Sequence, residues 1–210
     1  MSTALVGMLW GVGAAHLVAY YTGHRAIAGV LKALPILGLA ALVFAAAQAS
    51  SGQLVGIGLV LGAVGDVSLV FPTGFLVGLS AFFLGHLCYI AAFAPEAVLT
   101  PVSAGVAVAL AAFATGMLRY LWPHVRHSRV RIPIGVYVAA ISTMAWCAIA
   151  RAIAPDAGGA DAAGALGAVS FLASDGVLAV NRFARPFAGA HAIVMVTYYA
   201  AQMLIARGAL

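Results

Sequence analysis

Residues 171–183 read Phe171-Leu172-Ala173-Ser174-Asp175-Gly176-Val177-Leu178-Ala179-Val180-Asn181-Arg182-Phe183. This apolar run carries one carboxylate, and an arginine follows it about two helical turns later on the same face. The whole sequence holds only five acidic residues. Burying a charge in an apolar segment costs free energy unless the charge is paired or has a function. We therefore expect Asp175 to be a buried functional group.

The composition around this run is typical of a membrane protein. The chain has 210 residues, of which 65% are hydrophobic and 7% are charged. A soluble domain of this size has too much surface for that balance, so we expect a polytopic membrane protein. The 24 glycines suit close approach of helices in lipid. The net charge of +5 does not indicate a nucleic-acid partner, because the basic residues fall in short connections between apolar runs.

Apolar segments of membrane-spanning length recur along the chain, separated by polar or Gly/Pro breaks. We expect an all-α fold with a single domain over residues 1–210, built as one bundle of eight transmembrane helices. The predicted spans are 4–22, 31–49, 53–71, 75–94, 98–118, 132–151, 162–180 and 187–206. No basic segment precedes the first span, which therefore predicts a retained helix rather than a cleaved signal peptide. Cys88 and Cys147 fall inside spans and show neither a disulfide nor a metal signature.

Basic residues concentrate in the connections that follow the odd-numbered spans. These connections hold Arg25, Lys32, Arg119, Arg126, Arg129, Arg131, Arg182 and Arg185. The opposite end has Arg151 and Arg207 together with three acids. The positive-inside rule therefore predicts that the first end is cytoplasmic and that both termini lie outside, in a bacterial cytoplasmic membrane.

The five acids divide into two groups. Glu96, Asp156 and Asp161 lie at span ends or in connections, where water can solvate them. Asp66 and Asp175 lie inside spans, at a similar depth in the predicted cytoplasmic half. Two carboxylates at one depth on different helices can converge on one site. The alternative is that each is neutralised separately by a structural partner.

Other polar side chains also lie within predicted spans. His86 and Tyr89 are three residues apart and face one way. The last span carries a polar stripe with His191, Met195, Tyr198 and Gln202, and Tyr199 lies beside it. Buried tyrosines and amides need hydrogen-bond partners, so this stripe indicates either a site or contacts between helices. His16 and His191 are weaker candidates, since single histidines on apolar helices usually serve packing.

Lys32 and Arg182 lie at the predicted cytoplasmic rim. Their side chains either extend to the lipid headgroups as ordinary rim residues or bind a lipid phosphate, for which arginine offers bidentate geometry.

In order along the chain, these polar motifs resemble those of the YhhN-type lysoplasmalogenase family. The matching residues are Lys32 with Pro35, Gly65-Asp66 with Leu69, Phe83-x-Gly85-His86-x-x-Tyr89, Tyr137, Ser174-Asp175 with Leu178-Ala179-x-Asn181-Arg182-Phe183, and Tyr198-Tyr199-x-x-Gln202. The ordered set covers most of the chain and is more specific than any single motif in it.

The resemblance implies an eight-span enzyme that hydrolyses the vinyl ether bond of lysoplasmalogens. The products are a fatty aldehyde and glycerophosphoethanolamine or glycerophosphocholine, so the implied partner is a lysophospholipid within the membrane. The implied catalytic residues are Asp66, Asp175 and His86. The implied substrate-binding residues are Lys32, Tyr89, Arg182, Asn181, Ser174, Tyr137, Tyr198, Tyr199 and Gln202. No metal or cofactor is expected.

The chemistry explains why two carboxylates suit this reaction. Protonation of the β-carbon gives an oxocarbenium ion, which a negative charge stabilises until water adds, as in glycosidases. We expect Asp66 and Asp175 to share one proton, so that one of them is the proton donor and the other the stabiliser and general base. His86 and Tyr89 would orient a carboxylate or the water.

Three other functions stay open. A metal-dependent lipid hydrolase would use Asp66, His86, Asp175 and His191, although no second histidine accompanies His86 on its helix. Gly65-Asp66 is loosely similar to intramembrane aspartyl proteases, but their flanking motifs are missing. A small proton-coupled transporter would use the carboxylates as a relay, although no internal repeat is clear.

Overall fold

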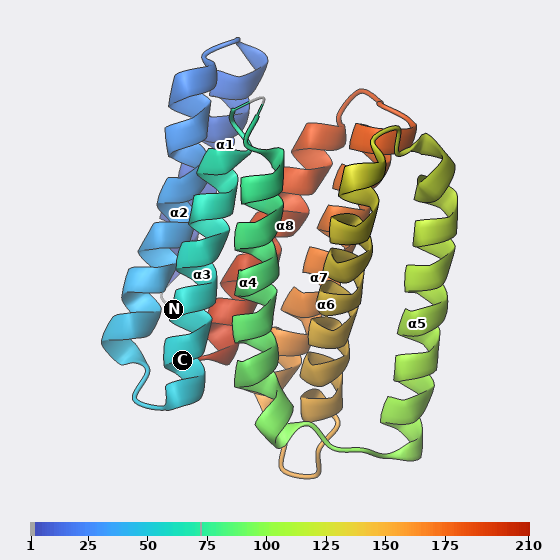
Figure 1. Cartoon of the computed structure of the whole chain (residues 1–210). Coiled ribbons are helices and arrows are strands. Elements are labelled where there is room, and N and C mark those ends of the chain that lie inside the picture. Colours follow the sequence, from blue (N-terminus) through green and yellow to red (C-terminus); the bar gives the residue numbers. More distant parts are fainter. Residues whose placement is uncertain (1–2, 72) are drawn as a thin grey trace.

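The computed structural model describes residues 3–71 and 73–210, and it folds them into an up-and-down helical bundle (Figure 1). The eight helices are α1 (Thr3–Tyr21), α2 (Arg25–Ala46), α3 (Ser50–Ser68), α4 (Phe75–Phe93), α5 (Pro101–Leu121), α6 (Ser128–Ala152), α7 (Gly159–Ala179) and α8 (Ala190–Gly208). Short 3-10 turns at Ala94–Glu96 and Trp122–His124 follow α4 and α5, and a π-helical turn, Val180–Ala184, extends α7. No strand occurs within the described ranges, which confirms the all-α class.

Six of these helical segments are long and apolar enough to cross a membrane, judged over the described residues. They are Arg25–Ala46, Ser50–Ser68, Phe75–Glu96, Pro101–His124, Ser128–Ala152 and Gly159–Ala184. α1 contributes a shorter apolar stretch, Val6–Tyr21. α8 is not among the six, and its sequence includes His191, Gln202 and Arg207. The structure therefore supports a membrane protein with six candidate spans, and eight crossings remain a prediction.

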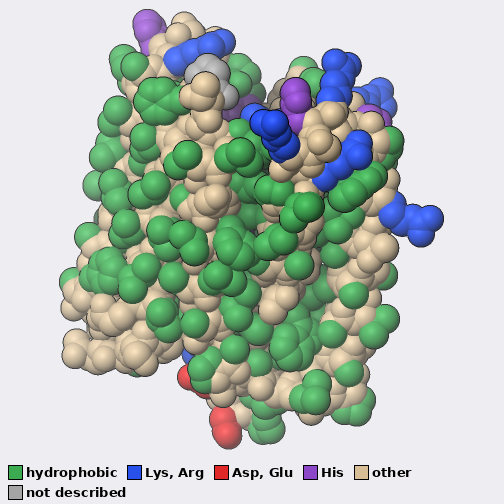
Figure 2. All heavy atoms as spheres, in the orientation of Figure 1, with side chains coloured by type: hydrophobic (Ala, Val, Ile, Leu, Met, Phe, Trp, Pro, Cys, Tyr) green, Lys and Arg blue, Asp and Glu red, His purple; other side chains and the backbone are tan. Residues whose placement is uncertain are grey.

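The outer surface of the bundle is apolar along every helix. Exposed side chains include Met8, Ile27, Ile57, Val77, Val108, Ile132, Leu166 and Ile193, one from each helix in turn. Such a continuous apolar surface is unfavourable in water and suits contact with lipid chains. Figure 2 shows the hydrophobic side chains spread over the height of the visible face.

The two ends of the bundle differ in charge, as the sequence predicted. The connections after α1, α3, α5 and α7 lie together at the upper end in Figure 1, and lysines and arginines gather there in Figure 2. We call this the basic end; it holds Arg25, Arg126, Arg129, Arg131 and Arg185. The visible acids lie at the opposite, lower end.

One expectation about the acids of the lower end was wrong. Asp161 is not solvated: its side chain is 13% exposed, and its carboxylate lies 2.6 Å from Arg151 Nε. The same nitrogen lies 3.0 Å from the carboxylate of Glu96. Arg151 thus joins the end of α6 to the start of α7 and to the turn after α4.

Two helix boundaries differ from the predicted spans in ways that affect the site. α2 begins at Arg25, six residues before the predicted span, so Lys32 lies about two turns inside the helix rather than at its start. α7 continues through its π-helical turn, so Arg182 is still part of helical backbone. Residues 26–30 are apolar, so the predicted start of α2 was simply too late. α7 instead continues into Asn181 and Arg182, polar residues that hydropathy does not assign to a span.

Small residues bring α3 against α4. Gly58 of α3 faces the ring of Tyr89, and Gly65 faces the ring of Phe82. A methyl group at either glycine would overlap the facing ring, so these positions set how closely the two helices approach. Asp66 follows Gly65 directly and is held deep in this tightly packed part of the bundle, with 1% of its surface exposed.

Candidate functional site

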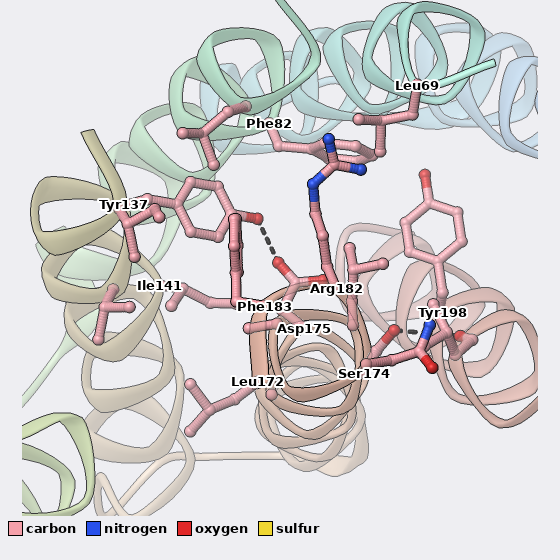
Figure 3. Close-up of a pocket in the computed structure, with 18 of the residues that line it drawn as sticks. Leu69, Phe82, Tyr137, Ile141, Leu172, Ser174, Asp175, Arg182, Phe183 and Tyr198 are labelled. Atoms are coloured by element: carbon pink, nitrogen blue, oxygen red, sulfur yellow. Dashed lines mark hydrogen bonds between the residues drawn. The ribbon is translucent and has the colours of Figure 1, made fainter. Parts of the chain in front are cut away.

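A cavity of about 400 Å³ lies toward the basic end of the bundle. Its polar lining includes Tyr20, Lys32, Asp66, Tyr137, Ser174, Asp175, Asn181, Arg182, His191 and Tyr198. Its apolar lining includes Leu79, Phe82, Phe113, Met117, Ile134, Val138, Ile141 and Leu172. The cavity therefore combines a charged wall with an apolar wall. Figure 3 shows how side chains of α4, α6, α7 and α8 surround it.

Asp66 is fixed by two partners, one for each carboxylate oxygen. Lys32 Nζ lies 3.0 Å from Oδ1, and the Tyr198 hydroxyl donates to Oδ2 at 2.8 Å. Lys32 reaches Asp66 because it lies well inside α2, at the level of the carboxylate. The pair compensates the charge of a carboxylate that water cannot reach.

A chain of hydrogen bonds continues from Asp66 into the bundle. The Gln202 amide nitrogen donates to the Tyr198 oxygen at 3.2 Å, and the Tyr89 hydroxyl donates to Gln202 Oε1 at 2.8 Å. Tyr89 and Gln202 are both buried and do not line the cavity. They support the orientation of Tyr198 and hence that of Asp66.

Asp175 belongs to a second network, on the other side of the cavity. The Tyr137 hydroxyl donates to Asp175 Oδ2, as the dashed line in Figure 3 marks. His86 Nε2 lies 2.9 Å from the Tyr137 oxygen. Since the only hydroxyl proton of Tyr137 goes to Asp175, His86 Nε2 is the donor in that contact. His86 Nδ1 is then a bare, buried acceptor, and it has no partner among the described residues.

Neither lysine nor arginine compensates Asp175 directly. Within the part of the chain that the structure describes, no such nitrogen lies within 4 Å of its carboxylate. Its Oδ1 takes part in no hydrogen bond to the described residues, while its side chain lines the cavity. The two carboxylates thus face one cavity in different states of pairing.

Arg182 reaches across the cavity from the π-helical turn, toward Phe82 and Leu69 in Figure 3. Its guanidinium carbon lies 4.1 Å from the centre of the Phe75 ring, a cation–π contact. No acidic side chain among the described residues pairs with it. Of the two cations expected at the rim, Lys32 is therefore engaged by Asp66 and Arg182 is available to an anion.

Three other predicted residues have their polar atoms occupied by the backbone. The Ser174 hydroxyl donates to the Val194 carbonyl at 3.0 Å, and the Tyr199 hydroxyl donates to the Lys32 carbonyl at 3.3 Å. Asn181 Oδ1 accepts from the Phe187 N–H at 3.1 Å. Ser174 and Asn181 line the cavity, whereas Tyr199 does not.

The structure thus brings together most, but not all, of the residues predicted for the site. His86, Tyr89, Tyr199 and Gln202 lie outside the cavity lining, one layer behind it. Tyr20 lines the cavity and was not predicted, because an aromatic residue at the end of a span usually marks the membrane interface. His191 also lines the cavity, although the sequence ranked it low.

Histidine, cysteine and acidic side chains, the usual protein ligands of a metal, are spread over the described residues. No group of three His, Cys, Asp or Glu side chains is placed there to hold a metal ion. Of the four residues that a metal-dependent hydrolase would use, Asp66 belongs to one of the networks described above and His86 and Asp175 belong to the other, while His191 bonds to His16.

Comparison with known proteins gives consistent matches over most of the chain. The model of the YhhN family matches residues 27–209. Human "Lysoplasmalogenase TMEM86B" is 35% identical over 184 residues, which cover 87% of this chain and 75% of the human protein. The pig protein of the same name is 37% identical over 85% of this chain and 74% of its own length. A "Lysoplasmalogenase" of Mycobacterium tuberculosis is 33% identical over 89% and 72%, respectively. No solved structure matches.

Proposed function

The chain belongs to the YhhN family, and from this membership together with its cavity we propose that it is a membrane lysoplasmalogenase. The enzyme hydrolyses the vinyl ether bond of a lysophospholipid to a fatty aldehyde and a glycerophospho-headgroup. The observation that carries the proposal is that Asp66 of α3 and Asp175 of α7 line one cavity whose remaining wall is largely apolar. Such a cavity suits a substrate with a polar head and a long alkenyl chain.

Asp175 is the proton donor in this mechanism. Lys32 compensates the charge of Asp66, whereas Asp175 has no such cation beside it. A carboxyl group without a counter-charge is held away from water more easily in its neutral form. Tyr137 holds Oδ2 of Asp175, which leaves Oδ1 to present the proton to the alkenyl carbon.

The reaction then balances with one water molecule. Asp175 protonates the β-carbon of the vinyl ether, and the electron pair of the double bond forms the new C–H bond. The resulting oxocarbenium ion is stabilised by the carboxylates of Asp175 and Asp66. Water adds to the α-carbon and returns a proton to Asp175. The hemiacetal then collapses, the C–O bond to glycerol breaks, and the alcohol oxygen takes the remaining proton.

The two walls of the cavity orient the substrate. The phosphate binds the guanidinium of Arg182, which no acid engages among the described side chains. The alkenyl chain lies along the apolar wall formed by α5 and α6, which includes Phe113, Met117 and Ile141. Lys32 acts on Asp66 rather than on the phosphate. In this orientation the basic end is cytoplasmic, and the headgroup enters from that side.

The test is release of fatty aldehyde from lysoplasmalogen by purified protein, measured by mass spectrometry. Asp66→Asn and Asp175→Asn should each lower the rate by at least about 100-fold, since each removes a charge or proton that the transition state needs. Asp156→Asn, at an exposed position of the α6–α7 connection, is the matched control and should keep the wild-type rate.

Two results would contradict this mechanism. Release of aldehyde by both site variants at the wild-type rate would show that the carboxylates are not catalytic. Loss of wild-type activity on treatment with a chelator, restored by a divalent metal, would favour the metal-dependent alternative.

A further inference from the structure

Three aromatic side chains form a cluster beside the cavity, at the end of α1 and the start of α8. His16 is buried, with 2% of its surface exposed. Its Nε2 lies 3.0 Å from Nε2 of His191, and the ring of Tyr20 stacks on that of His191 with centroids 3.6 Å apart. Tyr20 and His191 line the cavity, whereas His16 lies behind them. The proposed mechanism uses none of the three.

The backbone fixes where the protons of this cluster lie. His16 Nδ1 lies 2.8 Å from the carbonyl oxygen of Ala28, which can only accept, so Nδ1 carries the proton. In neutral imidazole the other nitrogen is then an acceptor, and His191 Nε2 must donate to it. The neutral ring of His191 is left with Nδ1 as a bare acceptor. This atom has no partner among the described residues, and protein atoms do not enclose it completely.

His191 thus lines the cavity and carries an unpaired hydrogen-bond acceptor, which a ligand with a donor group would satisfy. A lysoplasmalogen has two groups with donors, the hydroxyl on the middle carbon of glycerol and, in ethanolamine lipids, the ammonium. Lys32 and Arg182 line the same cavity and disfavour a second cation there. The neutral hydroxyl is the better match.

We propose that His191 accepts a hydrogen bond from the free sn-2 hydroxyl and thereby selects lipids that have lost their second chain. This inference rests on the proposed function. The vinyl ether, the hydroxyl and the phosphate sit on three successive carbons of glycerol, and Asp175, His191 and Arg182 line one cavity that meets all three. An acylated sn-2 oxygen has no proton to donate, so it would leave the His191 nitrogen without a partner.

The experiment compares two substrates that differ only at this carbon, a lysoplasmalogen and its 2-deoxy analogue, each with an ethanolamine or a choline headgroup. Wild-type protein should favour the hydroxyl substrate in kcat/KM by about 10- to 100-fold. His191→Phe keeps a ring against Tyr20 but has no acceptor, and it should bring that ratio close to one. His191→Leu removes the same nitrogen and serves as the second variant if the first does not fold. His24→Phe, at an exposed position, should keep the wild-type ratio.

The outcomes separate cleanly. A folded His191 variant that keeps the wild-type ratio overturns the proposal, and so does a wild-type protein that shows no preference for the hydroxyl. A change confined to the ethanolamine–choline comparison also overturns it, because it would assign His191 to the ammonium. If the wild-type protein releases aldehyde from none of the four substrates, that result would instead refute the proposed function itself.

Discussion

At the scale of single residues, one hydroxyl group joins the carboxylate of Asp175 to the buried imidazole of His86. Tyr137 donates to Asp175 and accepts from His86. His86 does not line the cavity, so it can act on the reaction only through Tyr137. In the proposed mechanism His86 is therefore a positioning residue and not a group that touches substrate.

Tyr137→Phe should therefore lower kcat by roughly 10- to 100-fold, because Asp175 loses the donor that holds it and His86 Nε2 is left unpaired. His86→Phe should have a similar effect, and the double variant should lose no more than the worse single variant. Steady-state kinetics on purified protein measures all three. Tyr120→Phe, on the exposed face of α5, is the control. Independent, multiplicative losses in the double variant would show that the two residues do not act in series.

Which acidic residues lie inside the bundle was easier to predict than what they contact. Asp66 and Asp175 stand out because carboxylates are rare in apolar runs, and their depth follows from counting residues to the span end. The partners do not follow, because the rotation of each helix about its axis decides whether Lys32 meets Asp66 or a phosphate. The hydropathy of α2 does not determine that rotation.

At the scale of elements, α3 and α4 carry the two ends of the hydrogen-bond chain described above. Asp66 is on α3 and Tyr89 is on α4, and Tyr198 and Gln202 join them. Gly58 lies against Tyr89, which is 1% exposed and bonded to Gln202. The ring therefore has little freedom to move away from a larger residue at position 58.

Gly58→Ala should destabilise the protein by about 1–3 kcal/mol, since the added methyl group overlaps a ring that is fixed on its other side. Gly105→Ala in α5, where an added methyl group meets no atom within 4 Å, should be neutral or slightly stabilising because alanine favours helix. Thermal unfolding in detergent compares the two variants. Equal melting temperatures would mean that α3 and α4 are not closely packed at Gly58.

Helix positions were predicted well from apolar segments of membrane-spanning length, but helix ends were not. α2 begins at Arg25, before the predicted start at residue 31, and the turn Val180–Ala184 extends α7 with a different hydrogen-bond pattern. Lys32 lies close to the first of these boundaries and Arg182 lies within the second, so the boundaries decide how deep in its helix each cation lies.

At the scale of the whole molecule, the difference in charge between the two ends predicts the orientation in the membrane. The alternation of the connections in Figure 1 follows from the number of apolar runs, which is why it could be predicted. The number of crossings is harder to predict, because the polar residues of α8 lower the mean hydropathy of that helix. Those same residues include Tyr198 and Gln202 of the Asp66 network.

The orientation predicts where reporters become active. A C-terminal alkaline phosphatase fusion should be active, and a fluorescent protein at the same site should be dark, because the end opposite the basic end faces out. Fusions truncated after Arg126, in the α5–α6 connection, should give the reverse pattern. Identical results at the two positions would contradict an odd number of crossings between them, and inverted results would contradict the orientation.

The division of the cavity into a charged wall and an apolar wall has a consequence for what happens after the bond is cut. The substrate is amphiphilic, but neither product is. The aldehyde partitions into the lipid and the glycerophospho-alcohol into water. α5 packs mainly on α6 and buries only Ser103 and Leu121. The apolar wall of the cavity therefore borders the lipid. We expect the two fragments to separate in opposite directions, which opposes their recombination and makes cleavage effectively one-way.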